Sequence, residues 1–193
     1  MSQTTLCFDF GNTRLKCGVM NGEELQEVLV LENVSTETIR RLVKKYQPAK
    51  SILSSVINHN AEIETVLSSA TRFHRLDYRS RIPVTTPVGK PQDIGADRLA
   101  LVVAAVHLFP GKNNLVIGLG SAITYNFINK YKEFIGGGIS PGMEMRFKSL
   151  NLFTAKLPLI EKDWNFPLIG YDTRTNITSG VILGMAKEID GMI

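Results

Sequence analysis

The sequence has only two cysteines among its 193 residues, Cys7 and Cys17, and each lies inside an apolar run. Two cysteines are too few for a disulfide scaffold, and no CxxC pair or Cys/His cluster offers a metal site. Two reduced, buried thiols are the simpler interpretation. The chain does not open with a charged segment followed by an apolar one, so we expect no secretion signal. We therefore expect a cytoplasmic protein.

Long apolar runs and blocks of like charge are also missing. The longest apolar stretch, residues 99–109, is interrupted by His107 and is too short to cross a bilayer. The 22 Lys and Arg outnumber the 18 Asp and Glu only slightly, and the basic residues are scattered singly. A nucleic-acid-binding protein gathers such charges on one face. We therefore expect neither a membrane protein nor nucleic-acid binding.

Two common nucleotide-binding signatures are absent. The chain has no GxxxxGK[ST] segment, and Ile123 stands where the third glycine after Gly118 and Gly120 would complete GxGxxG. This argues against P-loop and Rossmann proteins. What remains is an ordinary globular composition, 44% hydrophobic and 21% charged, with enough apolar residues to bury a real core.

The predicted elements recur in the same order. The first series has strands at 4–10, 14–20 and 25–31, a helix at 36–46 with Ser35 as N-cap, a strand at 50–55, a helix at 61–70, a loop at 80–95 and a helix at 96–109. The second series has strands at 115–119, 123–129 and 132–135, then helices at 143–151 and 173–192.

An ungapped alignment of the two series places Gly11 on Gly120 and Asn12 on Ser121. The identities are few, so the shared strand–turn–strand–turn–strand order is the better argument for a repeat. We predict an α/β protein of two topologically similar halves, 1–110 and 111–193. The second half is the shorter and lacks a last strand and helix on this interpretation.

The segment Asp9–Thr13 (DFGNT) ends the first strand with a carboxylate, a glycine and short polar side chains. A carboxylate at the end of a buried strand needs a partner, and this combination suits a phosphate group with its metal ion. A type I′ hairpin turn explains the same residues equally well when they are taken alone. The matching Gly118–Ser121 turn favours the first interpretation, because two such hairpins facing across a cleft can hold a nucleotide.

A second candidate segment, Gly95-Ala96-Asp97-Arg98, opens the strongest predicted helix. The helix dipole favours Asp in the first turn whatever its role, so helix capping is one interpretation. In the other, Asp97 is a general base while Arg98 and the loop N–H groups hold an anionic substrate. A positioned base is typically worth about 10²–10⁴ in rate.

Three consecutive glycines, Gly136–Gly138, precede the predicted helix at 143–151. A glycine run before a helix N-terminus is suited to phosphate binding. A tight crossover between elements is the alternative.

Taken together, these motifs resemble the type III pantothenate kinases of the acetate kinase/actin-like superfamily. The matching segments, in family order over nearly the whole chain, are DFGNTRLK (9–16), GADR (95–98), GLGSAITYN (118–126), GGGISPGMEMR (136–146), TAKLP (154–158) and GYDTRTNITSG (170–180). Each segment is weak alone, but the set is specific. The variants ITYNFIN and FTAKLP are closest to the Bacteroidetes branch.

The resemblance implies an actin-like (ribonuclease H-like) fold with duplicated βββαβα halves and a nucleotide cleft between them. It implies transfer of the ATP γ-phosphate to the primary hydroxyl of pantothenate, which gives 4′-phosphopantothenate in coenzyme A biosynthesis. It further implies Mg²⁺, a monovalent cation (potassium or ammonium) and a homodimer with substrate sites at the subunit interface.

The resemblance also assigns residues. Asp9 would lie near the phosphates and Mg²⁺, and Asp97 would accept the proton of the substrate hydroxyl. The remaining ATP-binding residues would be Gly11, Asn12, Thr13, Lys16, Gly120 and Ser121. The pantothenate-binding residues would be Gly95, Ala96, Asp97, Arg98 and Thr173.

Four positions and the C-terminus depart from the family pattern. Gly118 replaces the Asp that binds the monovalent cation, and Asn126 replaces a second Asp. Ser121 replaces Thr but keeps the hydroxyl, and Val88 replaces a substrate-contacting Tyr. The C-terminal strand with its TGG-type nucleotide turn is absent.

These departures leave three functional hypotheses. The first is a type III pantothenate kinase, truncated or impaired. An active kinase without a carboxylate at Gly118 should have lost or changed its potassium requirement, which makes cation dependence the discriminating observation. The second is a catalytically impaired homologue that acts as a nucleotide-binding or regulatory accessory protein, similar to the Bvg accessory factor group. The third is another sugar-kinase-like enzyme of the same fold.

Overall fold

The computed structural model describes residues 3–86 and 89–193. Its elements, in chain order, are β1 (Thr4–Phe10), β2 (Leu15–Asn21), β3 (Glu24–Leu31), α1 (Thr36–Tyr46), β4 (Lys50–Ser55), α2 (Glu62–Ala70), β5 (Arg72–Arg75), the short 3₁₀ helix η1 (Pro91–Asp93), α3 (Ala96–Leu108), β6 (Asn114–Leu119), β7 (Ala122–Ile128), β8 (Phe134–Pro141), α4 (Met143–Leu152) and α5 (Thr173–Asp190). They form two compact units. The first unit is the chain up to Asn114 together with Ile128–Gly136, and the second unit is Leu115–Phe127 with Gly137–Ile193.

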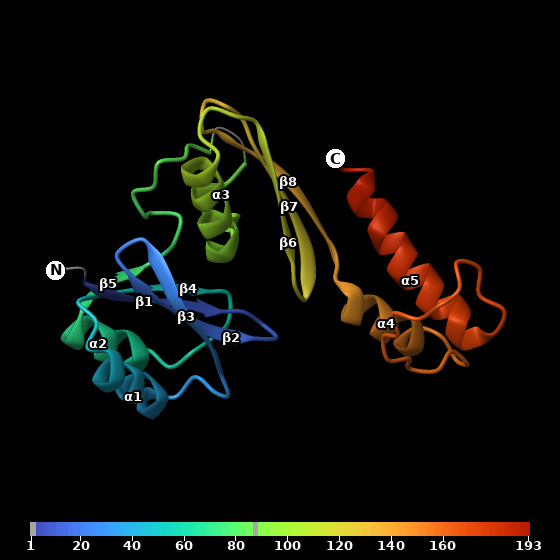
Figure 1. Ribbon diagram of the computed structural model, residues 1–193, viewed down its shortest axis with the longest axis horizontal. Coiled ribbons are helices and arrows are strands. Elements are labelled where there is room, and N and C mark those ends of the chain that lie inside the picture. The colour runs from blue at the N-terminus through green and yellow to red at the C-terminus, as the bar shows by residue number, and fades with distance from the viewer. Residues whose placement is uncertain (1–2, 87–88) are drawn as a thin grey trace. The chain divides into compact units, whose positions relative to one another are not determined.

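The first unit is built on a five-stranded sheet of order β3-β2-β1-β4-β5. The strands β1, β2 and β3 form an antiparallel meander, while β4 and β5 run parallel to β1. Helices α1 and α2 cover one face of this sheet, and α3 lies on the other (Figure 1). The predicted order of three strands, helix, strand and helix is therefore confirmed, and so is the α/β class.

The alternation of β1 explains this layering. Leu6, Phe8 and Phe10 are buried and pack with Leu53 of β4 in the core under α1 and α2. Successive strand residues point to opposite faces, so Asp9 points to the α3 side. Burying a large apolar side chain contributes about 1.5–3 kcal/mol, which fixes the register of β1 and with it the direction of Asp9.

Local signals set the first helix. The Ser35 hydroxyl accepts a hydrogen bond from the Thr38 N–H at 3.1 Å, which caps α1 as the sequence predicts. Ile39 and Leu42 lie on its buried face. The helix ends at Tyr46, before the left-handed residue Gln47 and Pro48.

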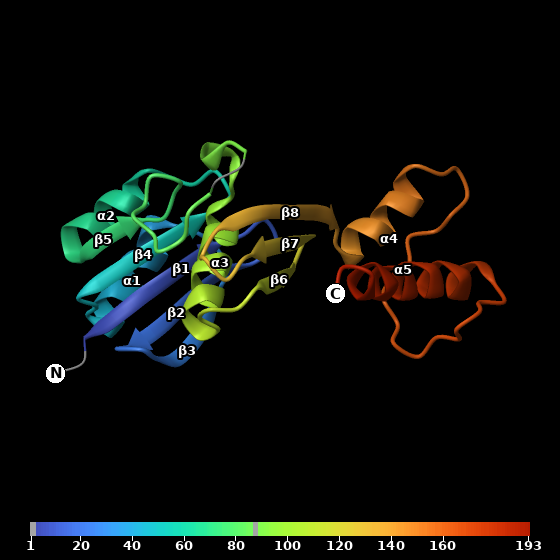
Figure 2. The same ribbon diagram turned by 90° about the horizontal axis from the view of Figure 1, so that it is seen from above.

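The second series begins with a three-stranded sheet of order β6-β7-β8, which confirms the predicted return of the strand–turn–strand pattern. Helices α4 and α5 of the second unit lie side by side (Figure 2). Their contact is formed by Phe147 of α4 and Ile177, Val181 and Ile182 of α5. Among the described residues, no helix is long and apolar enough to span a membrane.

Two strands differ from the sequence prediction. The glycine run is not a loop before a helix, because Gly136–Gly138 lie inside β8. Gly136 has φ of 117°, a conformation that side chains disfavour, so glycine here lets a strand bend. The short strand β5 was not predicted at all.

The two thiols lie on neighbouring strands. Both are free; Cys17 is buried beside Phe8, and Cys7 is partly buried on the opposite face of the sheet. Burial raises the pKa of both, that of Cys17 to about 12. The prediction of two reduced thiols is confirmed, although only one of them is fully buried.

Candidate active site

The first hairpin carries the first group of predicted site residues. Asp9 stands opposite Lys16 in the β1–β2 ladder, and its carboxylate lies 3.7 Å from the Lys16 Nζ. Both side chains are about half exposed, so this ion pair is weak and a ligand can replace it. Asn12 and Thr13 are exposed in the connecting loop.

The geometry of this loop tests one of the two sequence interpretations, the type I′ turn. Phe10 pairs with Leu15, which leaves the four residues 11–14 between the strands, and the Gly11 N–H donates to the Arg14 carbonyl at 3.1 Å. A type I′ turn has two central residues with positive φ, and neither of the central residues here, Asn12 and Thr13, has one. The type I′ interpretation is therefore wrong, although the bond between Gly11 and Arg14 still closes a short turn.

The start of α3 carries the second group. Asp97 is partly buried in the first turn, and its Oδ1 accepts the Arg98 N–H at 2.8 Å. A Cβ on Gly95 would come within 2.5 Å of this oxygen, so glycine gives the carboxylate room to fold back on the helix end. The Oδ1 bond thus satisfies one N–H of the first turn, although the N-cap residue Gly95 itself has no side-chain cap. This bond leaves Oδ2 available, because among residues 3–86 and 89–193 this oxygen has no hydrogen-bond partner.

Arg98 is held by its surroundings. Its guanidinium lies over the ring of Phe134, 5.4 Å from the centroid. Burial lowers the pKa of Arg98, while the nearby Asp97 carboxylate acts in the opposite direction. Even so, the group stays charged at neutral pH because an arginine pKa starts so high.

The strand β4 connects these two groups. A Cβ on Gly95 would lie 3.8 Å from Val56 Cγ1, immediately after β4, and α3 packs against this strand. β4 is also the parallel neighbour of β1, with Ser54 in register with Asp9. The first unit therefore brings the end of β1 and the start of α3 to the same end and the same face of its sheet.

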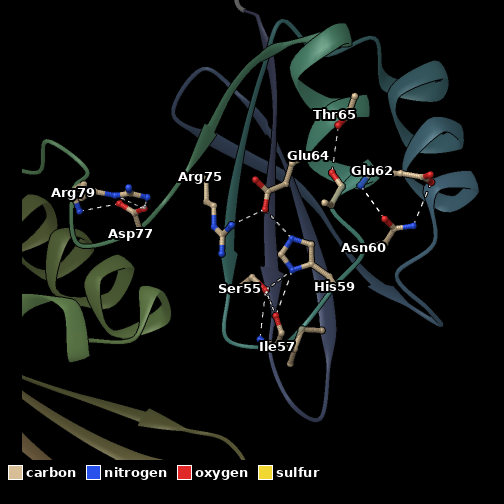
Figure 3. A network of polar contacts seen from close by, with 11 residues as sticks. Ser55, Ile57, His59, Asn60, Glu62, Glu64, Thr65, Arg75, Asp77 and Arg79 are labelled. Atoms are coloured by element: carbon tan, nitrogen blue, oxygen red, sulfur yellow. Dashed lines mark hydrogen bonds and ion pairs between the residues drawn. The ribbon is translucent and has the colours of Figure 1, made fainter.

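A polar network supports the opposite face at this end (Figure 3). The nearly buried His59 has Nδ1 at 3.0 Å from the Ser55 hydroxyl and Nε2 at 3.0 Å from Glu64 of α2. Arg75 of β5 donates to the same Glu64 oxygen at 2.9 Å. The His59 ring packs edge-on against Phe10, with 5.7 Å between centroids, and so lies behind the residue that follows Asp9. Sequence patterns gave no signal for this network.

In the second unit, the β6–β7 turn lies against the start of α4. The Gly142 N–H donates to the Ser121 carbonyl at 3.0 Å. A Cβ on Gly142 would be only 2.3 Å from the Gly120 carbonyl oxygen, so no side chain fits there. The helix start thus lies beside Gly120 and Ser121. The helix-start phosphate site expected after the glycine run would therefore be at Gly142, six residues beyond Gly136.

Thr173 begins α5 in the same unit. Asp172 caps this helix, because its carboxylate accepts the Thr175 N–H at 2.7 Å, and these bonds lower the pKa of Asp172. Thr173 lines a pocket of about 590 Å³ between α4 and α5, together with Arg146 and Asn176. The pocket is largely apolar, with a few polar groups, as small-molecule sites commonly are.

Arg146 is the centre of a network that sequence reasoning missed. Its guanidinium donates to the Pro141 carbonyl at 2.7 Å, to the Ser140 hydroxyl at 2.8 Å and to the Glu188 carboxylate. The Tyr125 hydroxyl donates to the other Glu188 oxygen at 2.9 Å. The Arg146 bond is the largest cause of the lowered pKa of Glu188. Arg146 ends the segment GGGISPGMEMR (136–146), but nothing in the sequence links it to Glu188.

The departures can be located in part. Gly118 lies in β6, and Asn126 is fully buried in β7, where its amide donates to the Val116 carbonyl at 3.1 Å. A carboxylate could not donate this bond, so the neutral amide fits its site. Val88 lies outside the described residues. In the part of the chain that the structure describes, no cluster of three or more His, Cys, Asp or Glu could hold a metal ion.

Comparison with known proteins identifies the family of this chain. The family profile described as type III pantothenate kinase matches residues 5–193. The chain belongs to the type III pantothenate kinase family. Relatives named type III pantothenate kinase occur in Christiangramia forsetii (41% identity over 191 residues), Phocaeicola vulgatus (40% over 189) and Cytophaga hutchinsonii (39% over 190). In each case the match covers 97% of this chain and 78% of the relative.

These relatives are Bacteroidetes proteins, as the sequence variants predict. The fold has a counterpart in the crystal structure of a conserved Campylobacter jejuni protein described as a Baf family transcriptional activator. That match has a TM-score of 0.59 at 22% identity, and it covers 97% of this chain and 79% of the other. At this identity the likeness concerns the fold alone.

Proposed function

We propose that this type III pantothenate kinase family member transfers the γ-phosphate of ATP to the primary hydroxyl of pantothenate, which yields 4′-phosphopantothenate for coenzyme A biosynthesis. The observation that carries the proposal is the family match over residues 5–193, together with relatives of the same name at about two-fifths identity. The regulatory alternative has no observation in its favour, and neither has a different sugar-kinase-like substrate.

In the proposed reaction Asp97 accepts the proton of the pantothenate hydroxyl. Its position supports this role, because Oδ1 is anchored on the helix end while Oδ2 is left for a substrate. Arg98 and Thr173 orient pantothenate. Arg98 is suited to an anionic substrate because it keeps its charge while being partly buried.

In this proposal the residues that bind the phosphates of ATP are Gly11, Asn12, Thr13 and Lys16 of the first hairpin and Gly120 and Ser121 of the second. Asp9 would hold Mg²⁺ of the Mg·ATP substrate. One half-exposed carboxylate fits that ion, since Mg²⁺ is commonly bound through one or two carboxylates with substrate phosphates and water completing the shell. Lys16 then neutralises the negative charge of the phosphates and no longer that of the Asp9 carboxylate.

The monovalent cation is the part of the family chemistry that this chain supports least. The resemblance places its carboxylate ligand at Gly118, which offers no side-chain oxygen. We therefore propose catalysis that does not depend on potassium or ammonium.

A cytoplasmic homodimer completes the proposal. Large apolar side chains are exposed on the second unit, Leu152, Phe153, Leu168, Ile169 and Tyr171 among them. Such exposure favours association. Size-exclusion chromatography with light scattering would measure the assembly. The division into halves at residue 110 remains a prediction.

The test is a mass-spectrometric assay for 4′-phosphopantothenate with ATP, Mg²⁺ and pantothenate. Asp97→Asn keeps the shape of the side chain but removes its basicity, so the turnover number should fall about 10²–10⁴-fold. Asp93→Asn, an exposed carboxylate in η1, is the matched control and should leave turnover unchanged. Absence of product from folded native chain would refute the kinase.

A further inference from the structure

The Ser54 hydroxyl is the unexplained polar group nearest to the proposed site. Its Oγ is buried, and it has no hydrogen-bond partner among the described residues. The whole residue is only 8% exposed. Buried hydroxyls are nearly always paired, because an unpaired one loses its bonds to water without replacement. A group left in this state needs a reason to be retained.

A second serine on the same strand shows the ordinary arrangement. Ser51 is 2% exposed, and its hydroxyl pairs with the Thr71 hydroxyl at 2.6 Å. Ser51 shares a face with Leu53, toward α1 and α2, whereas Ser54 lies on the other face, toward α3. On the face of β4 toward α1 and α2, the buried hydroxyl therefore has a hydrogen-bond partner. On the face that carries Asp9, the buried hydroxyl has none among the described residues.

Register places Ser54 beside Asp9. The two residues are directly paired on the parallel strands β4 and β1, so their side chains leave the sheet next to each other. The Asp9 carboxylate is instead directed to Lys16 at 3.7 Å, across the other neighbouring strand. This pair is half exposed and weak, so the carboxylate can turn when a ligand takes Lys16.

We propose that Ser54 is a positioning residue for Asp9, which donates its hydroxyl hydrogen to the Asp9 carboxylate when Mg·nucleotide is bound. The inference rests on the proposed function of Asp9. Carboxylates that ligate a metal are themselves held by outer hydrogen bonds, which fix the oxygen that the metal receives. In this arrangement the Ser54 hydroxyl is unsatisfied in the free protein and satisfied in the complex. The free energy of that bond therefore favours the bound state.

The experiment compares Ser54→Ala with Ser51→Ala in the full chain. The first readout is the apparent Mg²⁺ affinity in the presence of a saturating non-hydrolysable ATP analogue, measured by calorimetry. The second is the pair of kcat/KM values for Mg·ATP and for pantothenate. The third is the melting temperature without ligand. Ser54→Thr, which keeps a hydroxyl, is the rescue variant.

We expect Ser54→Ala to melt at the native temperature or above it, and to lose about 10–100-fold in Mg²⁺ affinity and in kcat/KM for Mg·ATP. The KM for pantothenate should stay within about twofold of the native value. Ser51→Ala should show the reverse, a melting temperature lower by a few degrees with native affinities. Ser54→Thr should restore most of the Mg²⁺ affinity.

Native Mg²⁺ affinity in Ser54→Ala would overturn the inference, and so would an equal loss for both substrates. Neither result would touch the kinase proposal, which depends on product formation by the native chain. Conversely, a native chain that binds Mg·nucleotide but forms no product would refute the kinase and still leave the role of Ser54 measurable by calorimetry.

Discussion

The guanidinium of Arg98 lies 5.4 Å from the centroid of the Phe134 ring, so the first turn of α3 is held against the start of β8. Phe134 is itself buried, and its N–H donates to the Thr85 carbonyl at 2.8 Å. Thr85 lies between β5 and η1. The start of α3 is therefore held from two sides, by the start of β8 and by β4. These contacts fix the direction in which its charged side chains point.

Replacing Arg98 with lysine tests that arrangement. Lysine keeps the charge but loses the planar fork and most of the contact with Phe134. We expect the KM for pantothenate to rise about tenfold, equivalent to about 1.4 kcal/mol, with a smaller change in kcat. Arg79→Lys is the matched control, since Arg79 lies over the Tyr78 ring at 5.5 Å on the exposed surface. Steady-state kinetics showing equal KM changes in both variants would contradict the assignment.

His59→Ala tests the network behind the hairpin. The change leaves the Ser55 hydroxyl and the Glu64 carboxylate without a shared partner and removes the ring that packs on Phe10. The free energy of unfolding should fall by about 1–3 kcal/mol, measured by urea denaturation. His74→Ala removes a similar serine bond from the exposed strand β5 and should change stability by no more than about 0.5 kcal/mol.

Glu188 gives the second unit a pH dependence with a definite sign. Bonds from Arg146, Ser140 and Tyr125 hold its folded-state pKa below the ordinary value of 4.5. A lowered carboxyl pKa stabilises the fold above the unfolded pKa, and this contribution is lost as pH falls through the folded pKa. The difference in melting temperature between native chain and Glu188→Gln should therefore be constant near neutrality and shrink below pH 4.5. A difference that persists unchanged into acid would refute the assignment. The exposed Glu144→Gln is the control.

Gly118→Asp tests the cation proposal by adding the carboxylate that this chain lacks. The native chain should phosphorylate pantothenate at the same rate in potassium chloride as in an equal concentration of sodium chloride. The variant supplies the carboxylate that the family pattern places there, so its rate should rise on addition of potassium. A native rate that already rises with potassium would show that other oxygens provide the cation site.

Much of the fold could be predicted from sequence because the signals are local. The alternation of Leu6, Phe8 and Phe10 predicts a strand with one buried face, and Ser35 marks the start of α1. Strand β5 was missed because Arg72–Arg75 is short and mostly polar and exposed, with Phe73 as its single apolar residue, and it is a strand only through pairing with β4. Strand β8 was misjudged because its glycines carry no strand signal of their own.

The site could be predicted only where one segment carries several chemical groups. Asp9 and Asp97 stand in such segments. Ser54, His59 and Glu188 do not, because their roles depend on partners on other elements. Ser54 depends on the register with β1, His59 on the packing of α2, and Glu188 of α5 on its contact with Arg146. Sequence spacing holds no information about these distances.

The protonated state of the two native thiols also makes this chain convenient for spectroscopy. Maleimides react with thiolates, and burial keeps Cys7 and Cys17 as thiols at neutral pH. A cysteine introduced on the surface, for example at the exposed Lys112, would therefore be labelled first without removal of either native residue. The chain would then carry a single fluorophore at a chosen surface position, with both native thiols unaltered.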